Sequence, residues 1–380
     1  MEIITPFKEA IDEIKEAGGE LFKYCYQCGL CDTVCPWNRV SNFSMRYLVR
    51  QAAFGLPEIE GQDIWRCTTC GSCPQRCPRG VATADVAVAF RKIATKYGIS
   101  PEPVHTVSAS LGTEGNPLRE ARSGRADWAN DLPVETFTEG MEILYFPGCY
   151  PSYDSRLKKV ALATSSILNK AGVNFGILGD KENCCGESIR KTGNETLYKR
   201  LARENIKTSI DNGVHRILVS SPHCYHTFKN EYPEFNVNFE VVHITQYLAE
   251  LVSEGRLELR EEYQKKITYH DPCYLGRHNG IYEEPRKVLN RVPGLELVEM
   301  TESRENSFCC GGGGGRIWMD TAKGERFSDL RLVQAIETGA DELVTACPYC
   351  ITNFEDSRLS VENGESIIIK DITEIISEVI

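Results

Sequence analysis

The chain has 380 residues, 41% of them hydrophobic, and a formal net charge of −11. This length predicts two or three domains, and the lack of any run of about 18 apolar residues argues against a membrane-spanning helix. The acidic balance, without a basic tract, argues against a nucleic-acid partner, because displacing counterions from phosphates needs a positive surface.

The N-terminal unit, residues 1–97, begins with an amphipathic pattern. Ile3, Phe7, Ile11 and Ile14 recur at spacings of three and four residues, which predicts a helix. Charged residues are mixed through 1–19, so this stretch lacks the apolar core of a signal peptide, and we expect a cytoplasmic protein. Thiols stay reduced in the cytoplasm, so the 17 cysteines indicate metal binding or catalysis rather than disulfides.

Two cysteine runs of the same form follow this helix. They read Cys25-x2-Cys28-x2-Cys31-x3-Cys35-Pro36 and Cys67-x2-Cys70-x2-Cys73-x3-Cys77-Pro78. Such runs hold pairs of 4Fe–4S clusters, with three thiolates on one cluster and the fourth, before proline, on the other. The predicted ligand sets are Cys25, Cys28, Cys31 and Cys77 for one cluster, and Cys67, Cys70, Cys73 and Cys35 for the other. Structural zinc is the alternative, but zinc requires neither the third cysteine nor the two Cys-Pro pairs.

Helix-like segments at 44–55 and 84–97 accompany the cysteine loops. We therefore expect a helical two-cluster domain rather than a small β-rich ferredoxin. Residues 98–140 hold many Pro, Gly, Ser and Asp residues with little periodicity, which predicts a long connector on the surface.

From Met141 the chain repeats itself at an offset of about 125 residues. The segment 145–150 (YFPGCY) matches 269–274 (YHDPCY), and 183–186 (NCCG) matches 308–311 (FCCG). The segment 213–224 (GVHRILVSSPHC) matches 339–350 (GADELVTACPYC) without a gap. This duplication predicts two similar domains, 141–262 and 263–380, packed as a pseudo-symmetric pair.

Each repeat alternates strands with helices. Strands are expected at 143–146, 174–178, 216–220 and 343–346, and helices at 155–171 and 195–212, closed by Gly172 and Gly213. Alternation of this kind predicts a mostly parallel α/β sheet, and the repeat cysteines follow strands, where open α/β sheets place their sites. The predicted architecture is multidomain: an α-helical two-cluster ferredoxin-type domain and two duplicated α/β domains.

The two repeats differ in their cysteines. The second has five: Cys273, Cys309, Cys310, Cys347 and Cys350. The first has four, Cys149, Cys184, Cys185 and Cys224, with Ser221 at the position of Cys347. Five thiolates are one more than a cubane takes, and a serine hydroxyl is a poor ligand for a soft metal. The first repeat therefore has three interpretations: a cubane on four cysteines, a distorted cluster, or no cluster. His223 and His226 flank Cys224 as substitute ligands or as hydrogen-bonding neighbours.

The cysteine spacing of the second repeat resembles the CCG domain of heterodisulfide reductase catalytic subunits. The order of parts along nearly the whole chain is similar to the membrane-linked D-type subunit of that family and to electron-transfer-flavoprotein-linked iron–sulfur oxidoreductases. The resemblance implies that the five cysteines of the second repeat hold a non-cubane 4Fe–4S cluster where a disulfide is cleaved. The implied cofactors are two cubane clusters and one non-cubane cluster, with a further cluster in the first repeat left open.

Three other features lie near these cysteines. His270 precedes Cys273 and either supplies a proton for disulfide reduction or makes a structural hydrogen bond, so we include it among the candidate catalytic residues. Gly311 to Gly315 do not complete a G-x-G-x-x-G pattern, because Arg316 takes its last position, and the glycines are expected to let the backbone approach a cluster. Arg316 either meets an anionic group of a substrate or lies in solvent.

Two functions follow from these patterns. In the preferred one, electrons pass through the two cubane clusters to the second repeat, where a disulfide is reduced or formed. In the alternative, the chain only relays electrons between a flavoprotein and a membrane quinone or cytochrome b subunit. Both require partner redox subunits, because the sequence has no recognisable flavin motif, and such a partner would hold the chain at the inner face of the membrane.

Overall fold

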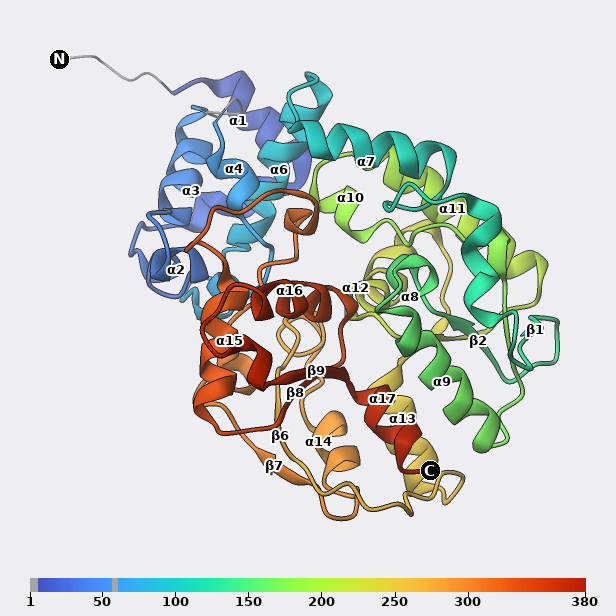
Figure 1. The fold of residues 1–380 in the computed structure, drawn as a ribbon. Coiled ribbons are helices and arrows are strands. Elements are labelled where there is room, and N and C mark those ends of the chain that lie inside the picture. The colour runs from blue at the N-terminus through green and yellow to red at the C-terminus, as the bar shows by residue number, and fades with distance from the viewer. Residues whose placement is uncertain (1–5, 57–60) are drawn as a thin grey trace. The chain divides into compact units, whose positions relative to one another are not determined.

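A computed structural model describes residues 6–56 and 61–380 (Figure 1). The chain forms two compact units. The first comprises the described residues up to Thr106 together with Ser188–Thr196 and Gly311–Phe327, and the second comprises the remainder. Within the described residues, no helix combines the length and the apolar character that crossing a bilayer requires.

The first unit is helical, and none of its described residues forms a strand. Its α-helices are α1 (Lys8–Ile14), α2 (Leu30–Thr33), α3 (Met45–Phe54), α4 (Asp63–Arg66), α5 (Ser72–Arg76), α6 (Thr83–Lys96) and most of α10 (Glu187–Lys191). A π-helical turn spans Lys15–Gly19, and 3-10 turns span Glu20–Tyr24, Pro36–Arg39 and Arg316–Trp318. The prediction of a helical rather than β-rich first domain is confirmed.

The ends of α3 follow from its sequence. Ser44 accepts a hydrogen bond at Oγ from the backbone N–H of Tyr47 at 3.1 Å, as an N-cap residue does. Gly55 closes the helix with a left-handed φ of 62°. The predicted helices at 44–55 and 84–97 are confirmed, and the N-terminal amphipathic helix is confirmed as α1. Its first predicted position, Ile3, lies outside the described residues.

The first repeat forms a parallel five-stranded sheet in the second unit. Its strands are β1 (Glu135–Thr136), β2 (Ile143–Phe146), β3 (Phe175–Ile177), β4 (Arg216–Val219) and β5 (Glu240–His243), in the order β1-β3-β2-β4-β5. Its helices are α8 (Cys149–Tyr153), α9 (Lys158–Lys170), α11 (Glu195–Asp211), α12 (Pro222–His226) and α13 (Ile244–Ser253). Gly172 and Gly213 adopt left-handed φ values of 63° and 71° just after α9 and α11, as the sequence predicts.

The second repeat forms a parallel sheet of the same design. Its strands are β6 (Lys266–Tyr269), β7 (Glu296–Val298), β8 (Glu342–Thr345) and β9 (Ile368–Asp371), in the order β7-β6-β8-β9. Its helices are α14 (Glu283–Leu289), α15 (Phe327–Glu337), α16 (Pro348–Arg358) and α17 (Ile372–Glu378). This order repeats β3-β2-β4-β5 strand for strand, so the two repeats share one topology.

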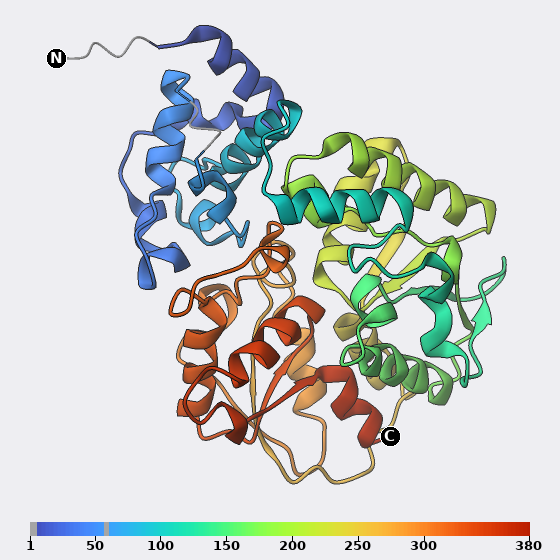
Figure 2. The same ribbon diagram turned by 45° about the horizontal axis from the view of Figure 1, so that its top comes forward.

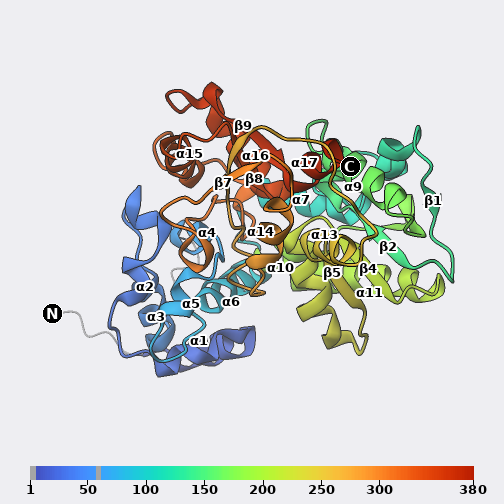
Figure 3. The same ribbon diagram turned by 90° about the horizontal axis from the view of Figure 1, so that it is seen from below.

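The two repeats exchange their last helices. α17, which follows the last strand of the second repeat, packs against α9 of the first repeat (Figure 2). α13, the corresponding helix of the first repeat, packs against α14 of the second repeat (Figure 3). Since α9 and α14 each follow the first core strand of their own repeat, the two contacts are equivalent and the pair is pseudo-symmetric. Each repeat therefore completes the core of the other.

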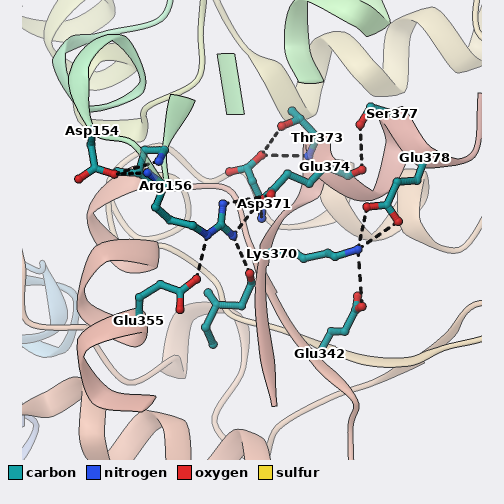
Figure 4. A network of polar contacts seen from close by, with 12 residues as sticks. Asp154, Arg156, Glu342, Glu355, Lys370, Asp371, Thr373, Glu374, Ser377 and Glu378 are labelled. Carbon is teal, nitrogen blue, oxygen red and sulfur yellow. Dashed lines mark hydrogen bonds and ion pairs between the residues drawn. The ribbon is translucent and has the colours of Figure 1, made fainter. Parts of the chain in front are cut away.

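An arginine network also joins the repeats (Figure 4). Arg156 lies just before α9, and its Nε lies 2.8 Å from Oε1 of Glu355 in α16. Its two terminal nitrogens each lie 3.0 Å from a carboxylate oxygen of Glu374 in α17, and Nη2 donates to the carbonyl of Ile369 at 2.7 Å. The side chains of Arg156 and Glu374 are only 25% and 12% exposed, so this fork is better shielded from solvent than an ordinary surface ion pair.

Residues 98–140 contain more regular structure than the sequence predicts. α7 spans Glu102–Thr113, a 3-10 helix spans Arg122–Ala129, and β1 pairs with β3 at the edge of the first sheet. The prediction that these residues form a long connector with little regular structure is therefore wrong. Prolines are tolerated in the first turn of a helix, and Val104, Val107 and Leu111 give α7 a buried stripe at helical spacing.

Candidate metal centres

The cysteine runs of the first unit follow the same backbone path twice. Cys31 lies in α2 and Cys73 lies in α5, and the two helices pack against each other. Each helix begins after a glycine with a left-handed φ, Gly29 at 84° and Gly71 at 81°. The two short loops thereby present their cysteines from equivalent positions.

Cys35 lies with the cysteines of the second run. Burial raises the pKa of its thiol, and the neighbouring thiols of Cys70 and Cys67 raise it further. The pKa of Cys73 is raised well above its usual range by burial and then by the same group of cysteines, including Cys35. Thr83 donates its hydroxyl to Sγ of Cys73 at 2.9 Å. This is the grouping that the predicted crossover of Cys35 requires.

The other group is closer to solvent. Cys28 is exposed, and Cys25, Cys31 and Cys77 are half-buried, whereas the three closely spaced cysteines of the second run are buried. Tyr26 lies near both Cys28 and Cys77, whose thiols, after burial, raise its pKa. The structure therefore places Cys77 near the first run, as the crossover requires, and leaves this side of the unit the more accessible one.

Arg91 links the second run to segments from both repeats. It lies in α6, it is fully buried, and it donates to four backbone carbonyls. Nε donates to Ile64 at 2.7 Å, Nη2 to Cys67 at 2.5 Å, and Nη1 to Lys191 at 3.0 Å and to Gly314 at 2.9 Å. Lys191 and Gly314 belong to the two segments that follow a Cys-Cys-Gly sequence. One guanidinium therefore holds both of these segments against the Cys67 loop.

The glycine run after Cys310 packs on the same loop. A Cβ at Gly313 would lie 2.4 Å from the carbonyl oxygen of Thr68, and a Cβ at Gly314 would lie 2.6 Å from that of Cys67. Only glycine permits backbones to approach this closely. The run thus brings backbone against a cysteine loop of the first unit, as its glycine content predicts.

Arg316 is half-buried, and its guanidinium is engaged within its own loop. It donates to the carbonyl of Asp320 and to the hydroxyl of Thr321, both at 2.8 Å, and it lies 5.7 Å from the ring centroid of Trp37. Burial lowers its pKa to about 10, with help from the positive charges of Arg91 and Arg66.

The five cysteines of the second repeat converge at the carboxyl ends of adjacent strands. β6 leads to Cys273, β8 leads to Cys347 at the start of α16, and Cys350 lies in the first turn of that helix. Cys310 and Cys350 have their Sγ atoms 3.3 Å apart. Cys309 hydrogen-bonds with Cys273, and Cys347 with Cys350. All five are buried. Their role as ligands of one cluster stays a prediction.

His270 joins this group through one ring nitrogen. One ring nitrogen of His270 and the Sγ atoms of Cys310 and Cys350 all lie within 4.8 Å of one another. Nδ1 accepts a hydrogen bond from Nε of Arg331 at 3.1 Å, which leaves Nε2 as the protonated nitrogen of the neutral ring. Burial, and then the charge of Arg331, lower the pKa of His270 well below its usual range. A neutral ring that accepts a hydrogen bond from a buried arginine favours the structural alternative for this residue.

The four cysteines of the first repeat are also gathered. Cys149 hydrogen-bonds with Cys184, and Cys185 with Cys224. A Cβ at Gly148 would lie 3.3 Å from Sγ of Cys224. The sequence thus predicted correctly which side chains meet, and the structure places no fifth cysteine with them among the described residues.

A buried arginine accompanies the first-repeat cysteines. Nη1 of Arg125 lies 3.6 Å from Sγ of Cys149, and its Nε lies 3.2 Å from Glu182, with both charged side chains almost completely buried. Sequence reasoning missed Arg125 because it lies in the segment predicted to be a connector. Its positive charge beside thiolates is suited to offset the negative charge of a bound thiolate cluster.

His223 belongs to the first repeat but contacts the second-repeat site. Its Nδ1 lies 3.0 Å from Oε2 of Glu187, and its ring hydrogen-bonds with the thiol of Cys347. Burial alone would lower the pKa of His223, but Glu187 and Cys347 raise it to about 10. Burial alone would raise the pKa of Cys347, but hydrogen bonds from Cys350 and His223 lower it to about 5. His226 instead lies beside Asn230, 3.1 Å from its Nδ2.

The donor set fits iron–sulfur clusters. Buried thiols without polar ligands are soft donors, which select iron–sulfur clusters, zinc or copper(I) rather than hard cations. Hydrogen bonding with Cys309, followed by burial, raises the pKa of Cys273 well above the usual range, and burial does the same for Cys350. A metal centre would displace these protons on binding. Both repeats and both cysteine runs offer such buried or half-buried thiol groups.

Comparison with known proteins agrees with this assignment. The model of the cysteine-rich CCG domain matches residues 143–229 and 267–355, and the model of the 4Fe–4S dicluster domain matches residues 21–81. A hypothetical protein from Helicobacter pylori has a crystal structure with a TM-score of 0.57 at 11% identity, covering 98% of this chain and 76% of that one. That likeness concerns the fold alone.

Three relatives share clear sequence identity with the chain. It is 37% identical to the "Probable iron-sulfur-binding oxidoreductase FadF" of Bacillus subtilis, over 84% of this chain and 47% of the relative. It is 37% identical to the "EtfAB:quinone oxidoreductase" of Syntrophomonas wolfei, over 84% of this chain and 46% of the relative. It is 33% identical to the D-type polypeptide of the dihydromethanophenazine:CoB--CoM heterodisulfide reductase of Methanosarcina barkeri, over 93% of both chains.

The chain thus spans about half the length of the first two relatives and nearly all of the third. Both kinds of domain that the cysteine patterns predict are matched, in the predicted order along the chain. The protein therefore belongs to the CCG-domain iron–sulfur oxidoreductases, the family that includes the D-type polypeptide of heterodisulfide reductase.

Proposed function

We propose that this protein is an iron–sulfur subunit that exchanges electrons between its N-terminal cysteine runs and the second repeat, where a disulfide is reduced or formed. The observation that carries the proposal is the convergence of five buried cysteines at one sheet edge, with the Sγ atoms of Cys310 and Cys350 3.3 Å apart. When bound, the clusters would supply one-electron transfer at the cysteine groups that hold them.

The chain supports an order for the cysteine groups. Gly311 follows Cys310 directly, and the backbone of Gly313 packs on Thr68, next to Cys67. We propose that the Cys67 group, against which this glycine run packs, is the one that exchanges electrons with the second repeat. The more accessible Cys25 group is then the one that faces an external electron partner.

The residues around the second-repeat site are suited to thiol chemistry. The low pKa of Cys347, about 5, keeps this sulfur as a thiolate at neutral pH, which is the form that binds metals and attacks disulfides. His270 keeps Nε2–H as a donor beside Cys310 and Cys350, because Arg331 occupies its other nitrogen. Reduction of a disulfide consumes two electrons and two protons. We assign His270 to orienting sulfur atoms, since its lowered pKa makes it a poor store of protons.

The partners are inferred from the printed names of the relatives. Those relatives include a heterodisulfide reductase subunit and an EtfAB:quinone oxidoreductase. We therefore propose that the chain works with a flavoprotein or a quinone-reactive or cytochrome b subunit, and that such a partner holds it at the inner face of the membrane. A disulfide or thiol compound is the proposed substrate.

A pure electron relay is the second candidate function. Two observations favour it: Ser221 stands where the first repeat would need a fifth thiol, and aromatic rings fill the contact between the two repeats. In this role the second repeat would carry electrons without binding a disulfide.

One set of measurements tests both roles. The preferred function requires about 12 iron atoms per chain, or about 16 if the first repeat is also loaded. A count near 8 in anaerobically purified protein would remove the second-repeat cluster and refute both candidate functions of that repeat. Adding dithiols to the oxidised protein should change the EPR spectrum if a thiol binds there. An unchanged spectrum in protein with about 12 or more iron atoms would favour the relay.

The matched variants are Cys310→Ser and Cys185→Ser, at equivalent positions of the two repeats. Cys310→Ser should abolish the dithiol-sensitive signal and leave both N-terminal clusters reducible. Cys185→Ser should have the milder effect, because its repeat already lacks one thiol. Equal loss of turnover in the two variants, with the remaining clusters assembled, would show that the repeats act together.

A further inference from the structure

The loop around Cys28 carries large apolar and aromatic side chains that are exposed to solvent. Tyr24, Tyr26 and Leu30 flank Cys28 in the sequence and are between 43% and 59% exposed. Tyr47 lies on α3 and is 46% exposed. α3 packs against α2, which begins at Leu30, and against the 3-10 turn that ends at Tyr24. A group of such side chains at the surface marks a site of interaction rather than an ordinary exposed residue.

The same two segments are basic. Residues 21–30 and 45–54 contain Lys23, Arg46 and Arg50 but no acidic residue, whereas the whole chain has a net charge of −11. All three cations are exposed. Arg46 and Arg50 are four positions apart, so they lie on one face of α3. The exposed side chains of these segments therefore have a charge opposite in sign to that of the chain.

Arg46 places this positive charge against the cysteine loop. A Cβ at Gly29 would lie 3.6 Å from Nη1 of Arg46. Nε of Arg46 lies 3.7 Å from Oδ2 of Asp32, and Gln27 donates from Nε2 to the carbonyl of Arg46 at 3.5 Å. Since Gln27 and Gly29 are the neighbours of Cys28, the guanidinium lies beside the exposed cysteine. We call the four apolar side chains and the three cations around Cys28 the Cys28 face.

These features together select the chemistry of a partner. A cluster on four thiolates carries a formal charge of about −2, so without nearby cations it would repel an acidic protein. Exposed cations around an interface attract a protein of opposite charge and orient it, and aromatic and arginine side chains are enriched at such interfaces. A lipid surface also attracts cations and aromatic rings. An exposed redox site instead favours a protein, because a protein can bring a second redox centre to it.

We infer that the Cys28 face is the docking site of a small acidic electron-carrier protein. Carboxylates of the carrier would meet Lys23, Arg46 and Arg50, and apolar side chains at its centre would meet the tyrosines. The inference rests on the proposed function in one respect, the role of the Cys25 group as the contact with an external electron partner. One electron passes between the carrier and the cluster in either direction, and no bond forms or breaks.

The test is surface plasmon resonance under anaerobic conditions, with the complete holoprotein immobilised and an acidic flavodoxin as the probe. The net charge of −11 predicts repulsion of this probe, so binding requires a local basic face. We expect binding at about 20 mM NaCl that weakens about tenfold at about 200 mM. Arg46→Glu should weaken the low-salt affinity by about tenfold. Arg50→Glu, which keeps the pair of Arg46 and Asp32, should act in the same direction. The control Lys159→Glu makes an equal change of charge at an exposed residue of α9 and should leave the affinity unchanged.

A second pair of variants tests the aromatic part of the face. Tyr47→Ala should weaken binding, because it removes an exposed ring without changing the charge. Its control is Tyr97→Ala, since Tyr97 is 59% exposed and follows α6. α6 has 14 residues and is about 21 Å long, and Thr83 at its other end donates to Cys73. All variants are compared at equal iron content, so that a weaker complex does not reflect a lost cluster.

The outcomes separate this inference from the proposed function. Absence of flavodoxin binding at low salt would refute the inference, as would equal losses of affinity in Arg46→Glu and Lys159→Glu. Binding of phosphatidylglycerol-containing vesicles that Arg46→Glu abolishes, without binding of flavodoxin, would assign the face to a membrane instead. About 8 iron atoms per chain together with salt-sensitive flavodoxin binding would refute both functions of the second repeat and support the docking site.

Discussion

Replacement of Arg91 by methionine tests how far one buried side chain holds the first unit together. Methionine keeps most of the aliphatic stem but removes four hydrogen bonds to the carbonyls of Ile64, Cys67, Lys191 and Gly314. A hydrogen bond from a charged donor contributes about 1.5–3 kcal/mol net. The low end of that range gives about 6 kcal/mol for four bonds.

Part of this loss is offset, because the variant no longer buries a guanidinium, whose desolvation is costly. We therefore expect Arg91→Met to lower the free energy of unfolding by about 4 kcal/mol, at the top of the range for single substitutions. Cys67 supplies one of the four carbonyls, so the cluster on this side should also be lost before the cluster on the Cys25 side.

The assay is guanidinium unfolding under anaerobic conditions, followed by far-ultraviolet circular dichroism and by the visible absorption of the clusters. Lys92→Met is the matched control on the same helix. Lys92 is partly exposed, with its Nζ 3.5 Å from Glu195, and such a pair contributes at most about 1 kcal/mol. Equal midpoints for Arg91→Met and Lys92→Met would refute the argument that this guanidinium organises the Cys67 loop.

Three further predictions concern backbone approach and pH. Gly313→Ala should destabilise the cluster on the Cys67 side, because the new Cβ would lie 2.4 Å from the carbonyl oxygen of Thr68. A lower iron content and a weaker EPR signal of that cluster would show this. The control Gly112→Ala, where a Cβ has room, should leave both measurements unchanged. The buried Asp371 has its pKa raised to about 7 by burial, above its unfolded value of about 3.9, so its contribution to stability is present at low pH and is lost as pH rises toward 7. Asp371→Asn should remove about 3 kcal/mol of this pH dependence between pH 5 and 8, measured by denaturation, and an unchanged slope would contradict it. Burial lowers the pKa of His243 to about 3, so its contribution to the free energy of unfolding is present above pH 6.5 and is lost as pH falls. His243→Asn should therefore flatten the acid side of the plot of stability against pH. A variant that keeps the wild-type acid slope would contradict this assignment.

The regular elements of the repeats were predictable because each carries its own local signals. The strands at 143–146 and 216–220 are short apolar runs, and they appear as β2 and β4. Gly172 and Gly213 end their helices because left-handed backbone is nearly free for glycine. The strand ends follow from these elements, so the convergence of the cysteines was also predictable from the sequence.

The exchange of α13 and α17 was not predictable in the same way. Both helices are amphipathic, and an apolar helix face shows that it is buried but not against which partner. The two contacts become visible only when the sheets are placed side by side in the second unit. His243 and Asp371 cap these helices at equivalent positions, with hydrogen bonds to the backbone N–H of Thr245 and Thr373.

The polar residues that complete the sites were the least predictable part. Arg125 lies in a segment whose prolines and glycines resemble a connector, and nothing in the neighbouring sequence pairs it with Cys149 or Glu182. His223 was noticed only as a neighbour of Cys224. Its contact with Cys347 spans two repeats, and contacts between residues distant in sequence depend on packing that local patterns do not encode.

The differences between the repeats that concern the cysteine sites lie at the ends of their strands. The strand order and the exchanged helices are the same in both halves, since a change there would open the shared core. The residues after β4 and β8 differ instead: Ser221 replaces the thiol of Cys347, and His223 replaces the phenol of Tyr349. Loops at strand ends tolerate such changes because they carry chemistry rather than packing. The first repeat, which has four cysteines, instead places His223 beside Cys347 of the second repeat, where all five cysteines remain.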